Sequence, residues 1–191
     1  INEIFNKNIK ISYLDILADT YIYQLHNDFS KIFNLMKKNK RNFFEKHKAN
    51  LLLKKYTINE IMTIASLVEK EGKSDDDKRL ISSVILNRLN QNMKLDIDAT
   101  VIFAITKGQH KFDRKLSMND LKLKDNFNTY LNKGLPNTPI CYVSRKTIEL
   151  VLENYKSTYL FYFFNKDYNK HVFSKTYNQH KKLLNEYRKN Q

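Results

Sequence analysis

The clearest pattern in the chain is an apolar repeat within residues 58–71, where Ile61, Ile64 and Val68 recur at steps of three and four. Such spacing places these side chains on one face of a helix, because a helix turns by about 100° per residue. Gly72 follows, and glycine commonly ends helices. The pattern therefore predicts a helix over residues 58–71.

Four further stretches show weaker helical spacing. Ser74 with Asp77 three residues later is typical of a helix start, because a small polar side chain can cap the free backbone N–H groups there. The basic stretch 37–55 predicts a solvated helix face or a loop, and residues 97–105 are compatible with a strand or a helix. The predicted helices cover residues 24–37, 74–89, 145–154 and 175–189.

The C-terminal third also contains a strand pattern. Residues 158–164 are almost entirely aromatic or apolar and predict a strand. A polar turn at 165–170 leads to a second short strand at 171–174, which predicts a hairpin. Residues 126–143 contain glycine and proline and predict an ordered loop. Together the elements predict an α+β fold that is mainly helical, with a C-terminal β-hairpin and a terminal helix.

Composition adds little to this picture, because it is that of an ordinary globular chain. The 191 residues are 41% hydrophobic, enough for one large domain or a domain with a small lobe. The net charge of +14 can indicate nucleic acid, an anionic membrane surface or a cell-wall polymer as partner. The lysines are scattered along the chain, which favours compositional bias over a binding face.

Several kinds of site are excluded by what the chain lacks. Cys141 is its single cysteine, which excludes an intramolecular disulfide and a cysteine-based zinc cage. The histidines show no pair at i and i+4, and glycine-rich phosphate loops are absent, so we expect neither a metal nor a cofactor. No apolar run reaches about 18 residues. Membrane attachment would therefore need an N-terminal anchor that precedes Ile1.

Two carboxylates near the end of the predicted helix are the main candidates for chemistry. Glu71 lies seven residues after Ile64 and four after Leu67, so it continues the apolar face. Glu69 points roughly 200° away from it. A carboxyl group on an apolar face holds its proton more tightly, as a general acid near neutral pH must. The alternative is that Glu71 is an ordinary solvated residue in the last helical turn.

Other polar residues occur where packing does not require them. Asn87 and Arg88 follow an apolar helix face, Asp98 precedes a small apolar segment, and Tyr130 lies in the predicted loop. Each has a structural alternative: Arg88 as a salt-bridging helix residue, Asp98 as a helix cap and Tyr130 as a core residue. These residues alone do not identify a reaction.

A series of short motifs runs in order through residues 17–187. They are Asp19-Thr20-Tyr21, residues 65–71, residues 85–89, residues 95–103, residues 127–130, Gly134-Leu135-Pro136, Pro139-Ile140, residues 159–163, His171, Phe173-Ser174 and His180. The series resembles the MltG (YceG-like) family of endolytic murein transglycosylases. Ala99, Phe127 and Asn137 depart from the family pattern, as does the turn at residues 142–144, but the carboxylates remain.

The resemblance implies a lysozyme-like helical catalytic core and a peptidoglycan lytic transglycosylase. Such an enzyme cleaves nascent glycan strands between N-acetylmuramic acid and N-acetylglucosamine, forms a 1,6-anhydro end and terminates strand elongation. The implied general acid is Glu71, with Glu69 as the alternative. The residues implied to bind the glycan are Asn87, Arg88, Asp98, Thr100, Asn128, Thr129, Tyr130 and His171.

The resemblance also implies domains, partners and location. Residues 1–23 would be a lead-in left from a preceding lobe, and residues 24–191 the catalytic domain. The implied partners are peptidoglycan glycan strands and the cell-wall synthesis machinery, at the outer face of the cytoplasmic membrane. Two alternatives stay open: a non-catalytic relative that binds glycan or protein partners, and, less favoured, a basic nucleic-acid-binding module.

Overall fold

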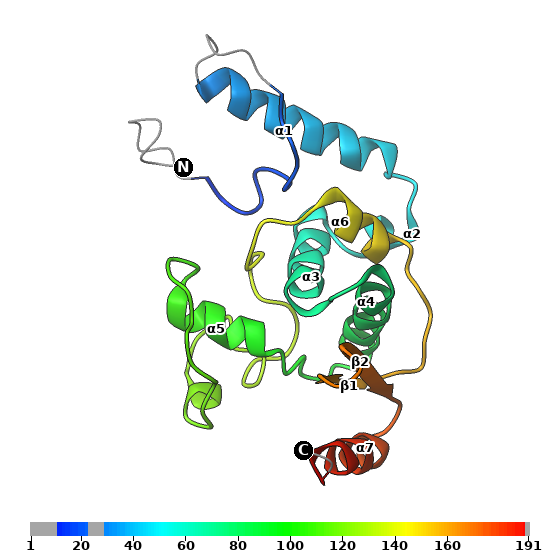
Figure 1. Ribbon diagram of the computed structural model, residues 1–191. Helices are drawn as coiled ribbons and strands as arrows, with labels where there is room; N and C mark the ends of the chain where they lie inside the picture. Colours follow the sequence, from blue (N-terminus) through cyan, green and yellow to red (C-terminus); the bar gives the residue numbers. More distant parts are fainter. Residues whose placement is uncertain (1–10, 23–28, 190–191) are drawn as a thin grey trace.

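The chain is described here by a computed structural model, which covers residues 11–22 and 29–189. Within these residues the regular structure is mainly helical, with one two-stranded sheet near the C-terminus, so the predicted α+β class is confirmed (Figure 1). The elements are α1 (Phe29–Lys46), α2 (Leu51–Lys55), α3 (Ile58–Glu71), α4 (Asp75–Asn90), α5 (Asp98–Thr106), the 3-10 helix η1 (Asp120–Lys122), α6 (Arg145–Leu152), β1 (Phe161–Asn165), β2 (Lys170–Ser174) and α7 (Tyr177–Lys189).

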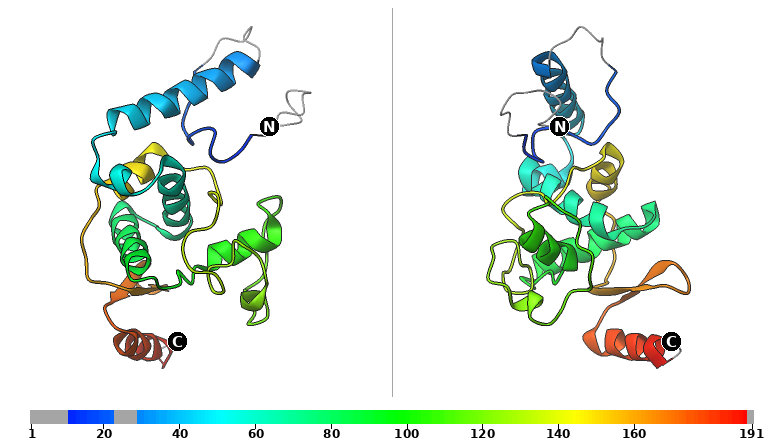
Figure 2. Two further views of the ribbon diagram at one scale, coloured as in Figure 1. Left: turned by 180° about the vertical axis from the view of Figure 1, so that it is seen from behind. Right: turned by 60° about the vertical axis from the view of Figure 1, so that its left-hand side comes forward.

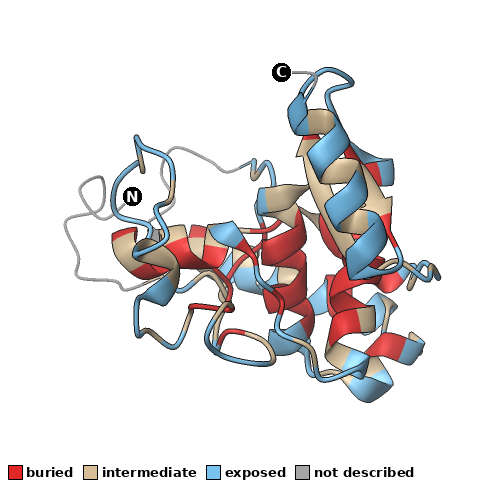
Figure 3. Cartoon of the chain, turned by 90° about the horizontal axis from the view of Figure 1, so that it is seen from below, coloured by how far each residue is buried: buried red, intermediate tan, exposed pale blue. Residues whose placement is uncertain are grey.

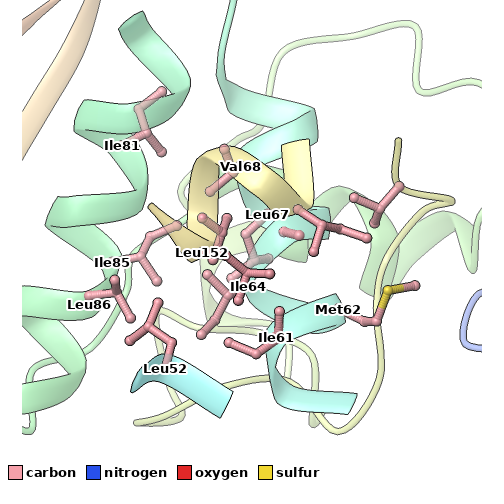
Figure 4. Packing of buried hydrophobic residues seen from close by; sticks show 14 of the residues in the cluster. Leu52, Ile61, Met62, Ile64, Leu67, Val68, Ile81, Ile85, Leu86 and Leu152 are labelled. Carbon is pink, nitrogen blue, oxygen red and sulfur yellow. The ribbon is translucent and has the colours of Figure 1, made fainter. Parts of the chain in front are cut away.

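Helix α3 forms the centre of the molecule. Every residue from Ile61 to Val68 is buried, so the helix is enclosed on all sides rather than on one face. A helix that is apolar around most of its circumference must lie inside a core. Side chains of α4 and α6, among them Ile85 and Leu152, pack against it, and Leu52 of α2 closes one end (Figure 4).

The central helices begin at residues whose side chains cap the free backbone N–H groups. Thr57 caps α3, and Glu60 reaches back to the Thr57 backbone N–H, which completes a capping box. Ser74 caps α4 as predicted, because its hydroxyl accepts a hydrogen bond from the Asp77 backbone N–H at 3.2 Å. Ser144 caps α6 in the same way. These caps fix where each core helix begins.

The segments that were ambiguous in the sequence are helical. Residues 98–106 form α5, and the basic stretch 37–55 is covered mostly by the end of α1 and by α2. The start of the helix predicted at 24–37 lies outside the described residues, and α1 is helical from Phe29. In two views α1 and α7 lie at opposite ends of the molecule, with α3, α4 and α6 between them, while α5 extends to one side (Figure 2).

The predicted hairpin is present, and its two faces contact different parts of the molecule. Strands β1 and β2 are antiparallel, with Tyr162 opposite Phe173 and Phe164 opposite His171. Phe163, on the other face, contacts aromatic side chains of α7. Helix α7 contains no buried residue (Figure 3). It therefore covers the outer face of the hairpin from the surface.

The lead-in segment is joined to the core. Leu17 belongs to the central apolar cluster, and Ala18 forms a parallel bridge with Ser144 at the start of α6. Asp19 also pairs with Arg145 at 2.7 Å. The predicted domain boundary at residues 23–24 lies outside the described residues.

Candidate active site

Glu71 is the last residue of α3, and the chain then turns sharply towards α4. The Gly72 backbone N–H donates to the Val68 carbonyl at 2.9 Å and so closes the helix. Gly72 thus ends the helix as the sequence predicted, and it does so with φ −76° rather than in a left-handed conformation. A Cβ at this position would lie 2.3 Å from Cγ of Lys78 and 3.2 Å from its Cα. Glycine is needed because α4 approaches the turn closely.

The Glu71 side chain lines a pocket of about 300 Å³. Five parts of the chain build it: the end of α3, Arg88 of α4, the segment from Leu95 to Asp98 at the start of α5, Tyr130 of the following loop, and the β-hairpin. Its volume lies at the small end of the range for ligand sites. The lining residues are Glu71, Arg88, Leu95, Asp96, Asp98, Tyr130, Tyr162, Phe163, Phe164 and His171.

The pocket changes the acidity of Glu71. Loss of solvent contact raises the pKa of its carboxyl from 4.5 to about 7, and the nearby Asp98 carboxylate adds to the rise. The Tyr162 hydroxyl, which donates to Glu71 Oε2 at 3.4 Å, opposes the rise, as do the Ala99 backbone N–H and the Lys73 ammonium group. Desolvation dominates, as expected for a carboxyl enclosed by apolar groups. The protonated form of Glu71 is therefore accessible near neutral pH.

Asp98, Tyr130 and Arg88, which also line the pocket, form hydrogen bonds with neighbouring groups. The Tyr130 hydroxyl donates to Asp98 Oδ1 at 2.6 Å, and burial together with this bond raises the pKa of Tyr130. The Arg88 guanidinium donates to the Leu95 carbonyl at 2.9 Å and to Asp96 Oδ2 at 3.0 Å. Arg88 is thus largely used in fixing the pocket wall.

Glu69 has a different environment from Glu71. Its Oε1 lies 3.3 Å from Lys78 Nζ, and its Oε2 accepts a hydrogen bond from the Ser144 hydroxyl at 3.2 Å. It does not line the pocket. The structure therefore separates the two candidate carboxylates and assigns Glu69 to the contacts between α3, α4 and α6.

Four of the residues implied to bind glycan also lie outside the pocket lining. The Asn87 amide donates to the carbonyls of Ser157 and Tyr159, both at 2.9 Å. Asn128 is buried, and its amide donates to the carbonyls of Leu121 in η1 and of Leu123, which follows η1. The hydroxyls of Thr100 and Thr129 are buried and lie 2.9 Å apart. These side chains support the walls, whereas Arg88, Asp98, Tyr130 and His171 are brought together with Glu71.

The hairpin contributes residues that the sequence had not singled out as site residues. Tyr162, Phe163 and Phe164 line the pocket, and Asp96 joins them from the opposite wall. The aromatic run was recognised as a strand, but which of its rings would face Glu71 depends on the pairing register. Within residues 11–22 and 29–189, no group of three or more His, Cys, Asp or Glu side chains is arranged to hold a metal ion.

Two larger hollows, each of about 560 Å³, lie beside α1 and beside the Gly134 loop. Their lining carboxylates have neighbouring partners: Asp15 lies 4.0 Å from Lys37, and Glu45 lies 3.6 Å from Lys48. Glu60 serves the capping box of α3. Neither hollow combines a desolvated acid with converging polar groups, so the smaller Glu71 pocket is the better candidate for an active site.

Comparison with known proteins identifies the family of the chain. The model of the YceG-like family matches residues 12–186. An endolytic murein transglycosylase of Bacillus subtilis (strain 168) is 35% identical over 188 residues, which are 97% of this chain and 51% of that protein. One of Streptococcus pneumoniae serotype 2 is 36% identical over 114 residues, 57% of this chain and 20% of that protein.

Among solved structures, the crystal structure of a yceG-like protein from Listeria monocytogenes superimposes with a TM-score of 0.77. It is 32% identical to this chain, and the match covers 95% of this chain and 59% of that one. The chain thus spans about half the length of the Bacillus relative.

Proposed function

The chain belongs to the YceG-like family, and we propose that it is an endolytic murein transglycosylase whose general acid is Glu71. Two relatives carry that activity in their names. The observation that supports Glu71 is its raised pKa of about 7 in a pocket large enough for part of a sugar chain. An acid with this pKa can be protonated near neutral pH and still release its proton readily.

The proposed reaction uses the same carboxyl group twice. Protonated Glu71 donates its proton to the glycosidic oxygen between N-acetylmuramic acid and N-acetylglucosamine, and the C1–O bond breaks. Positive charge develops at C1 of the muramyl residue. The Glu71 carboxylate then takes the proton of the C6 hydroxyl of that residue, while the C6 oxygen bonds to C1. The products are a new N-acetylglucosamine 4-hydroxyl end and a 1,6-anhydro-muramyl end.

This chemistry needs one carboxyl group from the protein, because the nucleophile belongs to the substrate. Ordinary glycoside hydrolysis uses a second carboxylate as base or nucleophile. Asp98 lies in the same pocket, but its Oδ1 is bonded to the Tyr130 hydroxyl at 2.6 Å. Because the nucleophile is the C6 hydroxyl in one reaction and water in the other, the products of cleavage distinguish a transglycosylase from a hydrolase.

In this proposal the pocket wall supplied by Tyr162 and Phe164, on the face of the hairpin opposite α7, packs against the apolar faces of the sugar rings. The substrate is nascent peptidoglycan, and cleavage ends strand elongation beside the synthesis machinery. The catalytic domain lies on the outer face of the cytoplasmic membrane. None of the helices in the described ranges has the length and apolar character needed to cross a bilayer.

The test is digestion of uncrosslinked glycan strands by wild type, Glu71→Gln and Glu69→Gln, followed by mass spectrometry. We expect internal cuts with 1,6-anhydro-muramyl ends from wild type and from Glu69→Gln, and none from Glu71→Gln. Loss of cleavage only in Glu69→Gln would reassign the acid. Ends with a water-derived hydroxyl would indicate a hydrolase, and glycan binding without cleavage by folded wild type would indicate a non-catalytic relative.

A further inference from the structure

Asp77 is a buried acid that its own helix does not use. Asp75 and Asp76, its neighbours in the first turn of α4, are exposed, whereas Asp77 is only 6% exposed. In a capping box the acid at this position reaches back to the cap residue, as Glu60 does in α3. In α4 the carboxylate instead reaches across to β2, where it meets His171.

Both contacts that Asp77 makes with His171 are with nitrogen atoms. Asp77 Oδ2 lies 3.0 Å from the ring Nδ1, and Asp77 Oδ1 accepts a hydrogen bond from the backbone N–H at 3.4 Å. An ionised carboxylate can only accept hydrogen bonds, so opposite an ionised Asp77 the 3.0 Å contact requires a hydrogen on Nδ1. In a neutral imidazole the other nitrogen, Nε2, then has a free lone pair.

The ring of His171 lies in the wall of the Glu71 pocket. Its register partner is Phe164, and its ring centre is 5.4 Å from that of Tyr162, whose hydroxyl donates to Glu71. Across residues 11–22 and 29–189, His171 Nε2 has no hydrogen-bond partner, yet it is not among the fully buried atoms that lack one. Nε2 is therefore not fully enclosed, and its ring belongs to a residue that lines the pocket.

We propose that Asp77 is a positioning residue that fixes the tautomer of His171, so that Nε2 accepts a hydrogen bond from the bound glycan. The donor would be a sugar hydroxyl or an acetamido N–H, since both are present along the strand. The inference rests on the proposed function, because the glycan is the ligand. If the pair only tied α4 to β2, the tautomer would not affect catalysis, and this difference can be measured.

The first measurement determines which ring nitrogen of His171 carries hydrogen, in wild type and then in Asp77→Asn. Imidazole 15N NMR of the wild-type chain at pH 8 should show His171 with hydrogen on Nδ1. In Asp77→Asn the backbone N–H of His171 still needs the side-chain oxygen, so the amide NH₂ faces Nδ1 and hydrogen moves to Nε2. The pocket then presents a donor where an acceptor stood. A wild-type spectrum with hydrogen on Nε2 overturns the proposal.

Kinetics then connect the tautomer to the glycan. Asp77→Asn should lower kcat/KM on uncrosslinked glycan strands roughly tenfold, the order expected when a hydrogen bond in a binding site is lost and its partner left unpaired. His171→Asn keeps an amide near the Nδ1 position and removes Nε2, whereas His171→Gln keeps an amide near Nε2 and should retain more activity. Adding Asp77→Asn to His171→Asn should change kcat/KM by less than twofold, since Asp77 acts through the ring.

Two results would overturn the inference: a kcat/KM of Asp77→Asn within twofold of wild type, or losses from Asp77→Asn and His171→Asn that multiply. Thermal unfolding of each variant measures separately how much the contact between Asp77 and His171 stabilises the packing of α4 against β2. If wild type yields no anhydro product, the proposed function fails, but the inference is still tested by glycan affinity. Asp77→Asn should then bind strands roughly tenfold more weakly, and unchanged affinity would overturn the inference as well.

Discussion

Replacing Glu71 by Gln should make the protein more stable at alkaline pH while abolishing cleavage. In the folded chain the pKa of Glu71 is raised from 4.5 to about 7, mainly by burial. Between these values the native state binds more protons than the unfolded state, so stability falls as pH rises. The loss in free energy of unfolding caused by ionisation of the buried carboxyl group is absent below about pH 4.5. It is complete above about pH 7, where it amounts to about 3 kcal/mol. Gln has similar size and no charge to desolvate.

The assay is urea unfolding of wild type and Glu71→Gln at pH 5 and pH 8, with the free energies of unfolding extrapolated to water. The advantage of the variant should grow by about 2.5 kcal/mol between the two pH values. Glu69→Gln is the matched control on the same helix, because it removes an ion-paired carboxylate that lies 3.3 Å from Lys78. The control should show no gain in stability at pH 8. A Glu71→Gln advantage that is the same at both pH values would refute the assignment of the desolvated acid.

Two further predictions follow from named contacts. First, kcat/KM should fall above about pH 7 as Glu71 loses its proton. Asp98→Asn removes a negative charge that raises the Glu71 pKa, so the decrease in kcat/KM should move to lower pH. Tyr162→Phe removes a hydrogen bond that lowers the Glu71 pKa, so the decrease should move to higher pH. Shifts in the opposite directions would contradict the electrostatic analysis. Second, Thr129→Val leaves the buried Ile97 backbone N–H without its acceptor at 3.0 Å. The free energy of unfolding should fall by about 1–3 kcal/mol, measured by urea unfolding, and a variant as stable as wild type would show that another group takes the bond.

The helices that the sequence predicted best are those with strong local signals. Apolar spacing in α3 and the capping residue Ser74 of α4 act within one or two turns, so a short stretch of sequence contains the information. Residues 97–105 were ambiguous because an almost uniformly apolar segment has no periodicity to read. In the structure Asp98 is the first residue of a helix. The choice between strand and helix depends there on tertiary packing, because the local pattern favours neither.

The candidate site was less predictable, because it depends on contacts between distant segments. Helical geometry alone separated Glu71 from Glu69, and the structure gives the two side chains different surroundings. Nothing local shows that Tyr162 would reach Glu71, 91 residues earlier. Asn128 illustrates the opposite problem, since a buried polar residue that holds loop carbonyls looks in sequence like one that binds ligand.

Helix α3 carries three glutamates, and their positions along it explain why only one suits acid catalysis. Glu60 lies in the first turn, where the free backbone N–H groups and the helix dipole favour a carboxylate, and it is used in the cap. Glu69 lies 3.3 Å from Lys78 and is used in an ion pair between α3 and α4. Glu71 lies at the C-terminal end, where the dipole opposes negative charge, and it faces a pocket that contains Asp98. Burial, the dipole and the Asp98 carboxylate act in the same direction there and outweigh the Tyr162 hydroxyl and the Lys73 ammonium group, so the proton is retained at the point where the helix meets the pocket.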